Sequence, residues 1–124
     1  MKRRWPWSRA ISLLEAEGDA ALPKLSDRQG RFVDRDLYIV VFDPSVTIRA
    51  HGFNNRLIGV NMTESRDPDG VPFGQLIVRS GQTSPDGGWV NFKFTNPVTR
   101  KIEPKAMFVR RTGTYIVCCG VYTG

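Results

Sequence analysis

The sequence contains little histidine and cysteine, and this excludes several kinds of site. Its 124 residues include one histidine, His51, and two cysteines, Cys118 and Cys119, which are adjacent. Neighbouring side chains of a strand point to opposite faces, so two free thiols are expected rather than a disulfide. A structural zinc site needs four converging ligands, so no metal is expected. No serine sits in a nucleophile motif and no glycine-rich phosphate loop is present, so neither an enzyme nor a cofactor is expected.

Long hydrophobic runs are also missing. Apolar stretches are short, as in residues 37–42, whereas a membrane-spanning helix needs about twenty apolar residues. We therefore expect no transmembrane segment in this chain. The basic start at residues 1–4 would suit a secretory signal, but residues 8–20 contain Arg9, Glu15 and Asp19 instead of an apolar stretch. No export signal is expected in the chain as written.

The excess of positive charge is concentrated at one end of the sequence. The net charge is +6, and residues 1–9 contain four basic groups and no acid. The remaining residues are nearly balanced, with 14 basic and 12 acidic groups. No recognition motif accompanies the charge, so no specific nucleic-acid partner is expected. The length suits one domain with a core of its own, and we predict a basic tail over 1–9 and one domain over 10–124.

The periodicity predicts an α+β fold with one helix followed by strands. Helical spacing of apolar residues indicates a helix over 8–22 that ends at Pro23, with Gly18 as a weak point. A second, short helix is expected over 72–81, inside a long irregular segment. The predicted strands are residues 37–43, 46–51, 88–95, 105–111 and 114–122. We expect a curved five-stranded antiparallel sheet of order 2-1-5-4-3, with the irregular segment crossing one face and a pocket between them.

Several motifs resemble one protein family. They are DLYIVVFD, AHGFNN, RDPDGVPF, GGWVNFKFTNPVTRKIEPK and the closing YIVCCGVY. Over about residues 31–122 the chain resembles the single Cache domain (type 2) of bacterial chemoreceptors, sensor histidine kinases and stand-alone secreted proteins. The resemblance implies a PAS-like fold that binds a small carboxylate such as acetate, propionate, pyruvate or lactate, for signal transduction or chemotaxis. It also implies a periplasmic or other extracytoplasmic location, although a cytoplasmic one stays open because no export signal is expected.

Two residues are candidate donors to a ligand carboxylate. Lys105 alternates with Met107 and Val109 in a predicted strand, so its side chain points toward the core. A buried ammonium needs an anionic partner, which a ligand would supply; the alternative is a strand-end lysine that reaches solvent. His51 ends a predicted strand and could donate to the same carboxylate. The alternative for His51 is a turn histidine bonded to the backbone.

Aromatic residues are expected to form a wall of the pocket. Parity places Trp89 on one face of its strand and Phe92 with Phe94 on the other. The family usually has Tyr at the position of Phe92 and Trp at that of Phe94, so two hydrogen-bond donors are absent here. Tyr38 keeps a hydroxyl that could reach the pocket or bond to the backbone. We therefore predict a ligand site of Tyr38, His51, Trp89, Phe92, Phe94, Lys105 and Met107.

This departure from the family pattern leaves a second function open, a protein-interaction module on the same fold without a small ligand. A homodimer is compatible with either function.

Overall fold

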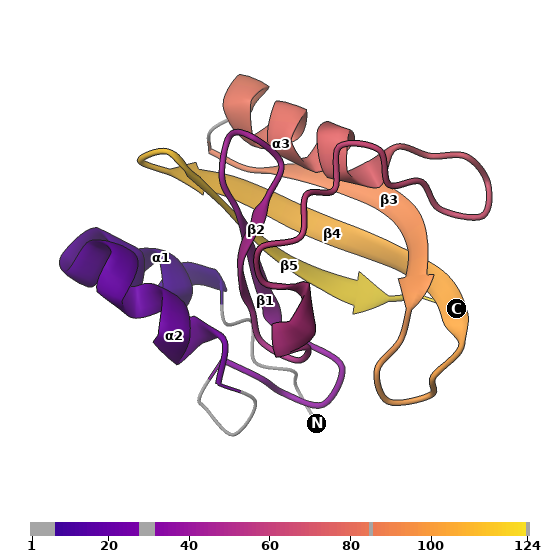
Figure 1. The fold of residues 1–124 in the computed structure, drawn as a ribbon, viewed down its shortest axis with the longest axis horizontal. Coiled ribbons are helices and arrows are strands. Elements are labelled where there is room, and N and C mark those ends of the chain that lie inside the picture. Colours follow the sequence, from indigo (N-terminus) through magenta and orange to yellow (C-terminus); the bar gives the residue numbers. More distant parts are fainter. Residues whose placement is uncertain (1–6, 28–31, 85, 124) are drawn as a thin grey trace.

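The computed structural model describes residues 7–27, 32–84 and 86–123 and has an α+β architecture. Figure 1 shows a twisted sheet with α1 and α2 on one side and α3 on the other. The helical elements are α1 (Trp7–Glu17), the 3₁₀ turn η1 (Gly18–Ala20), α2 (Ala21–Leu25), the 3₁₀ turn η2 (Asn55–Leu57) and α3 (Phe73–Thr83). The strands are β1 (Ile39–Phe42), β2 (Ile48–His51), β3 (Gly88–Thr95), β4 (Ile102–Thr112) and β5 (Tyr115–Tyr122).

The sheet has the predicted topology. Its five strands follow the order β2-β1-β5-β4-β3, and every neighbouring pair is antiparallel. The register between β3 and β4 sets Phe92 opposite Lys105, and the register between β4 and β5 sets Lys105 opposite Tyr122. Three residues that are far apart in the sequence thus meet on neighbouring strands.

Strict alternation along the central strands divides the core into two layers. In β1 and the residue before it, Tyr38, Val40 and Phe42 belong to the cluster on the α3 side. Ile39 and Val41 belong to the cluster on the side of α1 and α2. Each such buried side chain stabilises the fold by about 1.5–3 kcal/mol. This alternation is why a run that looks uniformly apolar in the sequence serves two separate faces.

The adjacent cysteines follow the same alternation. Cys118 belongs to the α3-side cluster and Cys119 to the opposite one; both are fully buried thiols that form no disulfide with the described residues. Burial raises the pKa of the Cys118 thiol, despite the nearby charge of Lys105. Both cysteines therefore act as small apolar core residues.

The N-terminal helix differs in detail from the prediction. The helical region continues to Leu25 instead of ending at Pro23, and Gly18, at φ +59°, divides it. Pro23 lies in the first turn of α2, where a missing N–H removes no intrahelical hydrogen bond. Residues 1–6 of the predicted basic tail lie outside the described residues, and residues 7–9 form the first turn of α1.

Several strand boundaries also differ. β1 spans Ile39–Phe42 rather than 37–43. β2 begins at Ile48 rather than at 46, because the Asp43 carboxylate accepts the N–H groups of Ser45 and Thr47 and extends the turn. β4 begins at Ile102 rather than at 105. Its first residues pair with β3 before β5 contributes partners, and a proline such as Pro104 is tolerated in such one-sided pairing.

Helix α3 lies unusually close to its neighbours. A Cβ at Gly74 would lie 2.6 Å from the carbonyl oxygen of Met62, and one at Gly81 would lie 2.7 Å from Cδ1 of Ile116. Such distances are shorter than real Cβ contacts, so glycine is required at both positions. Because of these two glycines, α3 packs directly on its neighbours and covers one side of the core.

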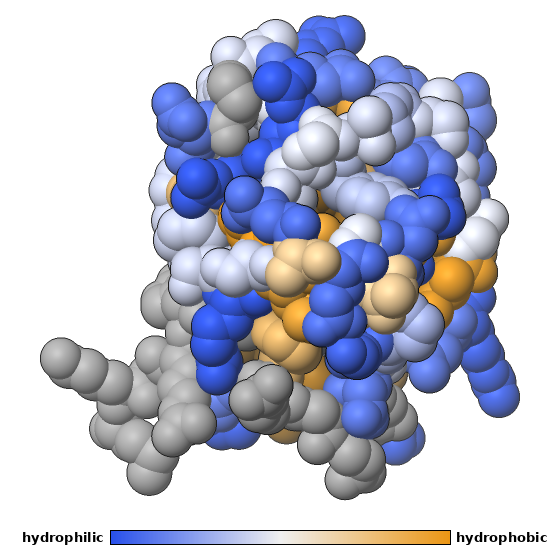
Figure 2. All heavy atoms as spheres, turned by 90° about the vertical axis from the view of Figure 1, so that its left-hand side faces the viewer, coloured by the Kyte–Doolittle hydropathy of each residue, from blue (hydrophilic) through white to orange (hydrophobic). Residues whose placement is uncertain are grey.

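One end of the molecule, at the left of Figure 1, faces the viewer in Figure 2 and is mainly polar. Apolar residues show there mainly in the middle of the view and at its right-hand edge. Among the described residues, none of the helices is long and apolar enough to cross a membrane.

Candidate functional site

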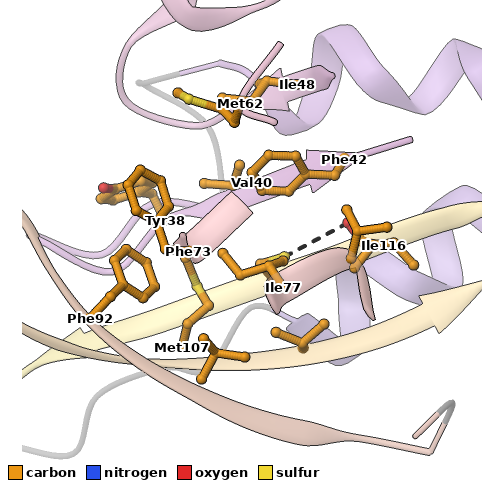
Figure 3. Close-up of a cluster of buried hydrophobic side chains, with 14 residues drawn as sticks. Tyr38, Val40, Phe42, Ile48, Met62, Phe73, Ile77, Phe92, Met107 and Ile116 are labelled. Carbon is orange, nitrogen blue, oxygen red and sulfur yellow. Dashed lines mark hydrogen bonds between the residues drawn. The ribbon is translucent and has the colours of Figure 1, made fainter. Parts of the chain in front are cut away.

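A small cavity lies between the sheet and the segment that crosses it, at the place predicted for the pocket. Its volume is about 20 Å³, roughly the space of one water molecule. Figure 3 shows the apolar cluster around it, with Tyr38 and Phe92 on one side and Ile116 on the other. The lining residues are Tyr38, Val40, Phe42, Ile48, His51, Met62, Phe73, Ile77, Phe92, Phe94, Lys105 and Met107.

Lys105 places a cation in this apolar surrounding. Its side chain is only 3% exposed, and its Nζ donates to the hydroxyl of Tyr38 at 3.0 Å. Nζ also lies 4.3 Å from the ring centre of Tyr38, 4.8 Å from that of Tyr122 and 5.7 Å from that of Phe94. Within the described ranges no carboxylate pairs with it. The stem has room because position 120 is glycine: a Cβ at Gly120 would lie 2.6 Å from Cε of Lys105.

His51 is held as a neutral hydrogen-bond donor. Its Nδ1 accepts the backbone N–H groups of Phe53 at 3.2 Å and Asn54 at 2.8 Å, which assigns the ring proton to Nε2. Burial, and then the charge of Lys105, lower the pKa of His51 to about 3. The ring is therefore uncharged near neutral pH. Nε2–H has no hydrogen-bond partner in the part of the chain that the structure describes.

The two alternatives considered for His51 are therefore compatible. The histidine is bonded to backbone through Nδ1 and still offers Nε2–H, and its side chain lines the cavity.

A chain of hydrogen bonds leads from Lys105 to the end of the sheet. Tyr38 accepts from Lys105, so it donates its own proton to Tyr122, 3.1 Å away. Tyr122 in turn donates to the backbone carbonyl of Thr95 at 2.8 Å. Burial and the neighbouring Tyr38 raise the pKa of Tyr122, so the hydroxyl of Tyr122 stays protonated. Hydrogen bonds thus connect the cavity to the last residues of β3 and β5.

Stacked phenylalanines form a wall of the cavity next to Tyr38 and Lys105. Phe73, at the start of α3, stacks on Phe92 with ring centres 4.8 Å apart and planes within 9°. Phe94 meets Phe73 edge-on at 5.7 Å. Such pairs add about 0.5–1.5 kcal/mol beyond the area they bury. The wall offers no hydrogen-bond donor, so the polar groups of the cavity are those of Lys105, His51 and Tyr38.

The turn before α3 is held against β3 by Asp67. One carboxylate oxygen accepts the N–H groups of Asp69 and Val71, and the other accepts that of Lys93, next to Phe92. Burial opposes ionisation, but these three hydrogen bonds outweigh it and lower the pKa of Asp67. These hydrogen bonds of Asp67 hold the turn before α3 against β3 and so position Phe73 on Phe92.

The structure brings six of the seven predicted site residues together around the cavity, and Trp89 is the exception. Trp89 is 56% exposed and lies on the other face of β3, 5.3 Å from the ring of Phe108. Phe108 also contacts Trp7 of α1. The inclusion of Trp89 in the ligand site was wrong, because the parity of β3 is uninterrupted and turns this side chain away from Phe92.

The sequence interpretation missed the residues that close the apolar end. Val40 and Phe42 follow from the alternation that begins at Tyr38, so this signal was present. Met62 and Phe73 come from the crossing segment, where no periodicity predicted which side chains face the sheet.

Outside the cavity lies an open vestibule of about 640 Å³. It shares Tyr38, His51 and Phe94 with the cavity, so the two are adjacent. Its rim contains Arg56, from η2, and Arg100, from the turn between β3 and β4. The vestibule thus adjoins the polar end of the cavity and has two basic side chains in its lining.

These features define a class of protein. An antiparallel sheet of order 2-1-5-4-3, crossed by a segment that covers a small cavity with polar groups at one end, is the architecture of PAS-like sensor domains. The family model of single Cache domain 2 matches residues 13–124. The chain belongs to this family and is a single Cache sensor domain.

Solved structures of similar fold agree with this assignment. A methyl-accepting chemotaxis protein from Vibrio parahaemolyticus is 19% identical with a TM-score of 0.79, over 93% of this chain and 82% of that one. The periplasmic sensor domain of a chemotaxis protein is 27% identical with a TM-score of 0.79, over 94% and 90%. A Cache chemosensory domain described for carboxylic acid recognition is 21% identical with a TM-score of 0.76, over 94% and 83%. No curated protein matches the sequence.

Proposed function

We propose that this domain binds a small carboxylate in the cavity beside Lys105 and acts as a sensor for signal transduction or chemotaxis. The buried ammonium of Lys105, which has no carboxylate partner among the described residues, is the observation on which the proposal rests. The Cache domain described for carboxylic acid recognition supports it by analogy of fold. The domain acts by binding rather than catalysis, and we place it in the periplasm by analogy with its family and with the periplasmic neighbour.

The energetics of a buried cation favour an anionic ligand. Removing an ammonium group from water costs several kcal/mol, and one hydroxyl acceptor returns only part of this. A carboxylate at Nζ would supply the opposite charge and strong, charge-assisted hydrogen bonds of about 1.5–3 kcal/mol each. His51 Nε2–H lines the same cavity and is a further donor, whereas the hydroxyl proton of Tyr38 is already donated to Tyr122. Two donors at one end of an apolar cavity suit a carboxylate.

The size of the cavity limits the ligand. A volume of about 20 Å³ holds a water molecule but no carboxylate. Binding therefore requires side chains that line the cavity, Lys105 among them, to move. Small acids of the acetate, propionate, pyruvate and lactate class need the least displacement.

Such a movement supplies a signal. When a carboxylate accepts the hydrogen bond of Lys105 Nζ, the hydroxyl of Tyr38 no longer accepts from Lys105. The hydrogen bond from Tyr38 to Tyr122 can then change. Tyr122 holds the end of β5 to Thr95. Ligand binding would thereby change the packing where β5 ends.

The proposal is tested by a thermal-unfolding screen of the protein against acetate, propionate, pyruvate and lactate. A ligand at 100 times its Kd stabilises the folded state by about 2.7 kcal/mol, which is a rise in Tm of several degrees. We expect this rise for at least one acid, and its loss in Lys105→Met. The matched control is Lys101→Met, because Lys101 is exposed and lines neither the cavity nor the vestibule. A flat panel would reject the proposal and favour an interaction module without a small ligand.

A further inference from the structure

The vestibule outside the cavity has an unbalanced charge. Arg56 and Arg100 both line it, both are exposed, and neither side chain has a hydrogen bond or ion pair with the described residues. Among the described residues that line the vestibule there is no aspartate or glutamate. Two unpaired guanidinium groups thus border one opening, directly outside the polar end of the cavity.

Two acidic residues outside the turn that presents Arg100 accept hydrogen bonds from its side chains. Glu103 accepts from the side chains of Asn96 and Thr99, and Asp36 accepts from Asn96. Asn96 is buried, whereas the contact between Thr99 and Glu103 is exposed. The carboxylates therefore build the turn and leave the guanidinium of Arg100 available to a ligand.

The volumes of the cavity and the vestibule also favour a ligand that extends outward. The inner cavity has about 20 Å³ and the vestibule about 640 Å³. An acid held at Lys105 finds room for the rest of its structure outward, past Tyr38 and His51, rather than inward among apolar side chains. A purely apolar tail in that direction would lie between two arginines and in water.

We infer that Arg56 and Arg100 form a second anion subsite, and that the preferred ligand is a short dicarboxylate. One carboxylate binds at Lys105 and the other in the vestibule. This inference rests on the proposed function, because it assumes that the first carboxylate binds at Lys105. Guanidinium groups suit the outer position because they bind carboxylates in a bidentate manner and keep their charge at every physiological pH.

The test compares acids that differ only in the second carboxylate: succinate with butyrate, and glutarate with pentanoate. Binding is measured by titration calorimetry at fixed ionic strength. The expected result is that the dicarboxylate of at least one pair binds about tenfold more tightly than its partner, since two solvent-exposed ion pairs contribute modestly. In Arg56→Gln/Arg100→Gln this advantage is lost, and the affinity for the monocarboxylate stays within about twofold.

The matched control is Arg111→Gln. Arg111 is exposed and lies near the end of β4 remote from Lys105, so the variant lowers the net charge without touching the vestibule. Glutamine at position 100 meets the same positive φ of 64° as arginine does, and both sites are exposed, so the double variant is expected to fold normally.

Each other outcome is decisive. If the double variant weakens both acids of a pair equally, the arginines only attract anions and the subsite does not exist. If monocarboxylates bind through Lys105 with no dicarboxylate advantage, this inference fails and the proposed function stands. If no acid of either kind binds, both fail.

Discussion

Replacing Lys105 with methionine should make the ligand-free protein more stable while it abolishes carboxylate binding. Lys105 is 3% exposed and has one hydrogen bond, to Tyr38, together with three aromatic rings within 6 Å of Nζ. Methionine keeps the unbranched stem beside Gly120 and removes the charge. Tyr38 keeps Tyr122 as the acceptor of its own proton, so no donor is stranded.

The expected gain follows from three opposing contributions. Burying the ammonium costs several kcal/mol. The hydrogen bond to Tyr38 returns about 1.5–3 kcal/mol, and the ring contacts return up to about 2 kcal/mol. Removing all of them leaves a net gain in the free energy of unfolding of about 1–2 kcal/mol, or about 3–8 °C in Tm. Binding sites commonly sacrifice stability in this way.

The assay is urea unfolding at pH 7, followed by circular dichroism without added acid. Lys101→Met serves as the control and should stay within about 0.5 kcal/mol of wild type, since Lys101 is exposed. A loss of 1 kcal/mol or more in Lys105→Met would refute the reasoning. It would mean that the aromatic rings and Tyr38 more than compensate the buried charge, and that no anionic ligand is needed.

Three further predictions concern other parts of the same core. Between pH 6.5 and 4.5 the free energy of unfolding should fall by about 2 kcal/mol, because the unfolded chain protonates His51 below pH 6.5 whereas burial and Lys105 hold its folded-state pKa at about 3; His51→Asn should remove most of this slope in urea titrations. Gly74→Ala should destabilise by about 1–3 kcal/mol in the same assay, because its Cβ would lie 2.6 Å from the Met62 carbonyl oxygen. Cys118 and Cys119 should resist thiol reagents until the protein unfolds, as followed by absorbance with and without urea.

Each of these has a result that would contradict it. An unchanged pH slope in His51→Asn would mean that His51 is protonated in the folded state. A neutral Gly74→Ala, judged against the exposed Gln82→Ala on the same helix, would mean that α3 packs less closely than described. Fast thiol labelling in the native protein would mean that β5 opens readily.

Local patterns predicted most of the architecture. The β-branched and aromatic runs placed five strands, and the likeness to PAS-like folds predicted their order, which the sheet confirms. Boundaries were less predictable where a side chain or a partner strand decides them. The Asp43 carboxylate caps the turn before β2, so β2 begins later in the sequence than predicted. Pairing with β3 makes β4 begin earlier than predicted, before Pro104. Neither effect depends on the residues of the strand itself, so local strand propensity does not predict where β2 and β4 begin.

For the candidate site, the sequence determined which chemistry is available and on which face it lies. The alternation of Lys105 with Met107 and of Phe92 with Phe94 is a property of the strand, because successive side chains of a strand point to opposite faces. The same rule separated the two cysteines, and it should have excluded Trp89 from the site.

Only the tertiary structure decided what these side chains meet. Register set Lys105 opposite Phe92 and Tyr122, and α3 brought Phe73 onto Phe92. Two features depend on segments distant in sequence. In the part of the chain that the structure describes, no carboxylate pairs with Lys105, and Arg56 and Arg100 line one vestibule. The alternation of side chains along a strand is a local consequence of backbone geometry. Burial and charge pairing arise only when segments distant in the sequence pack together.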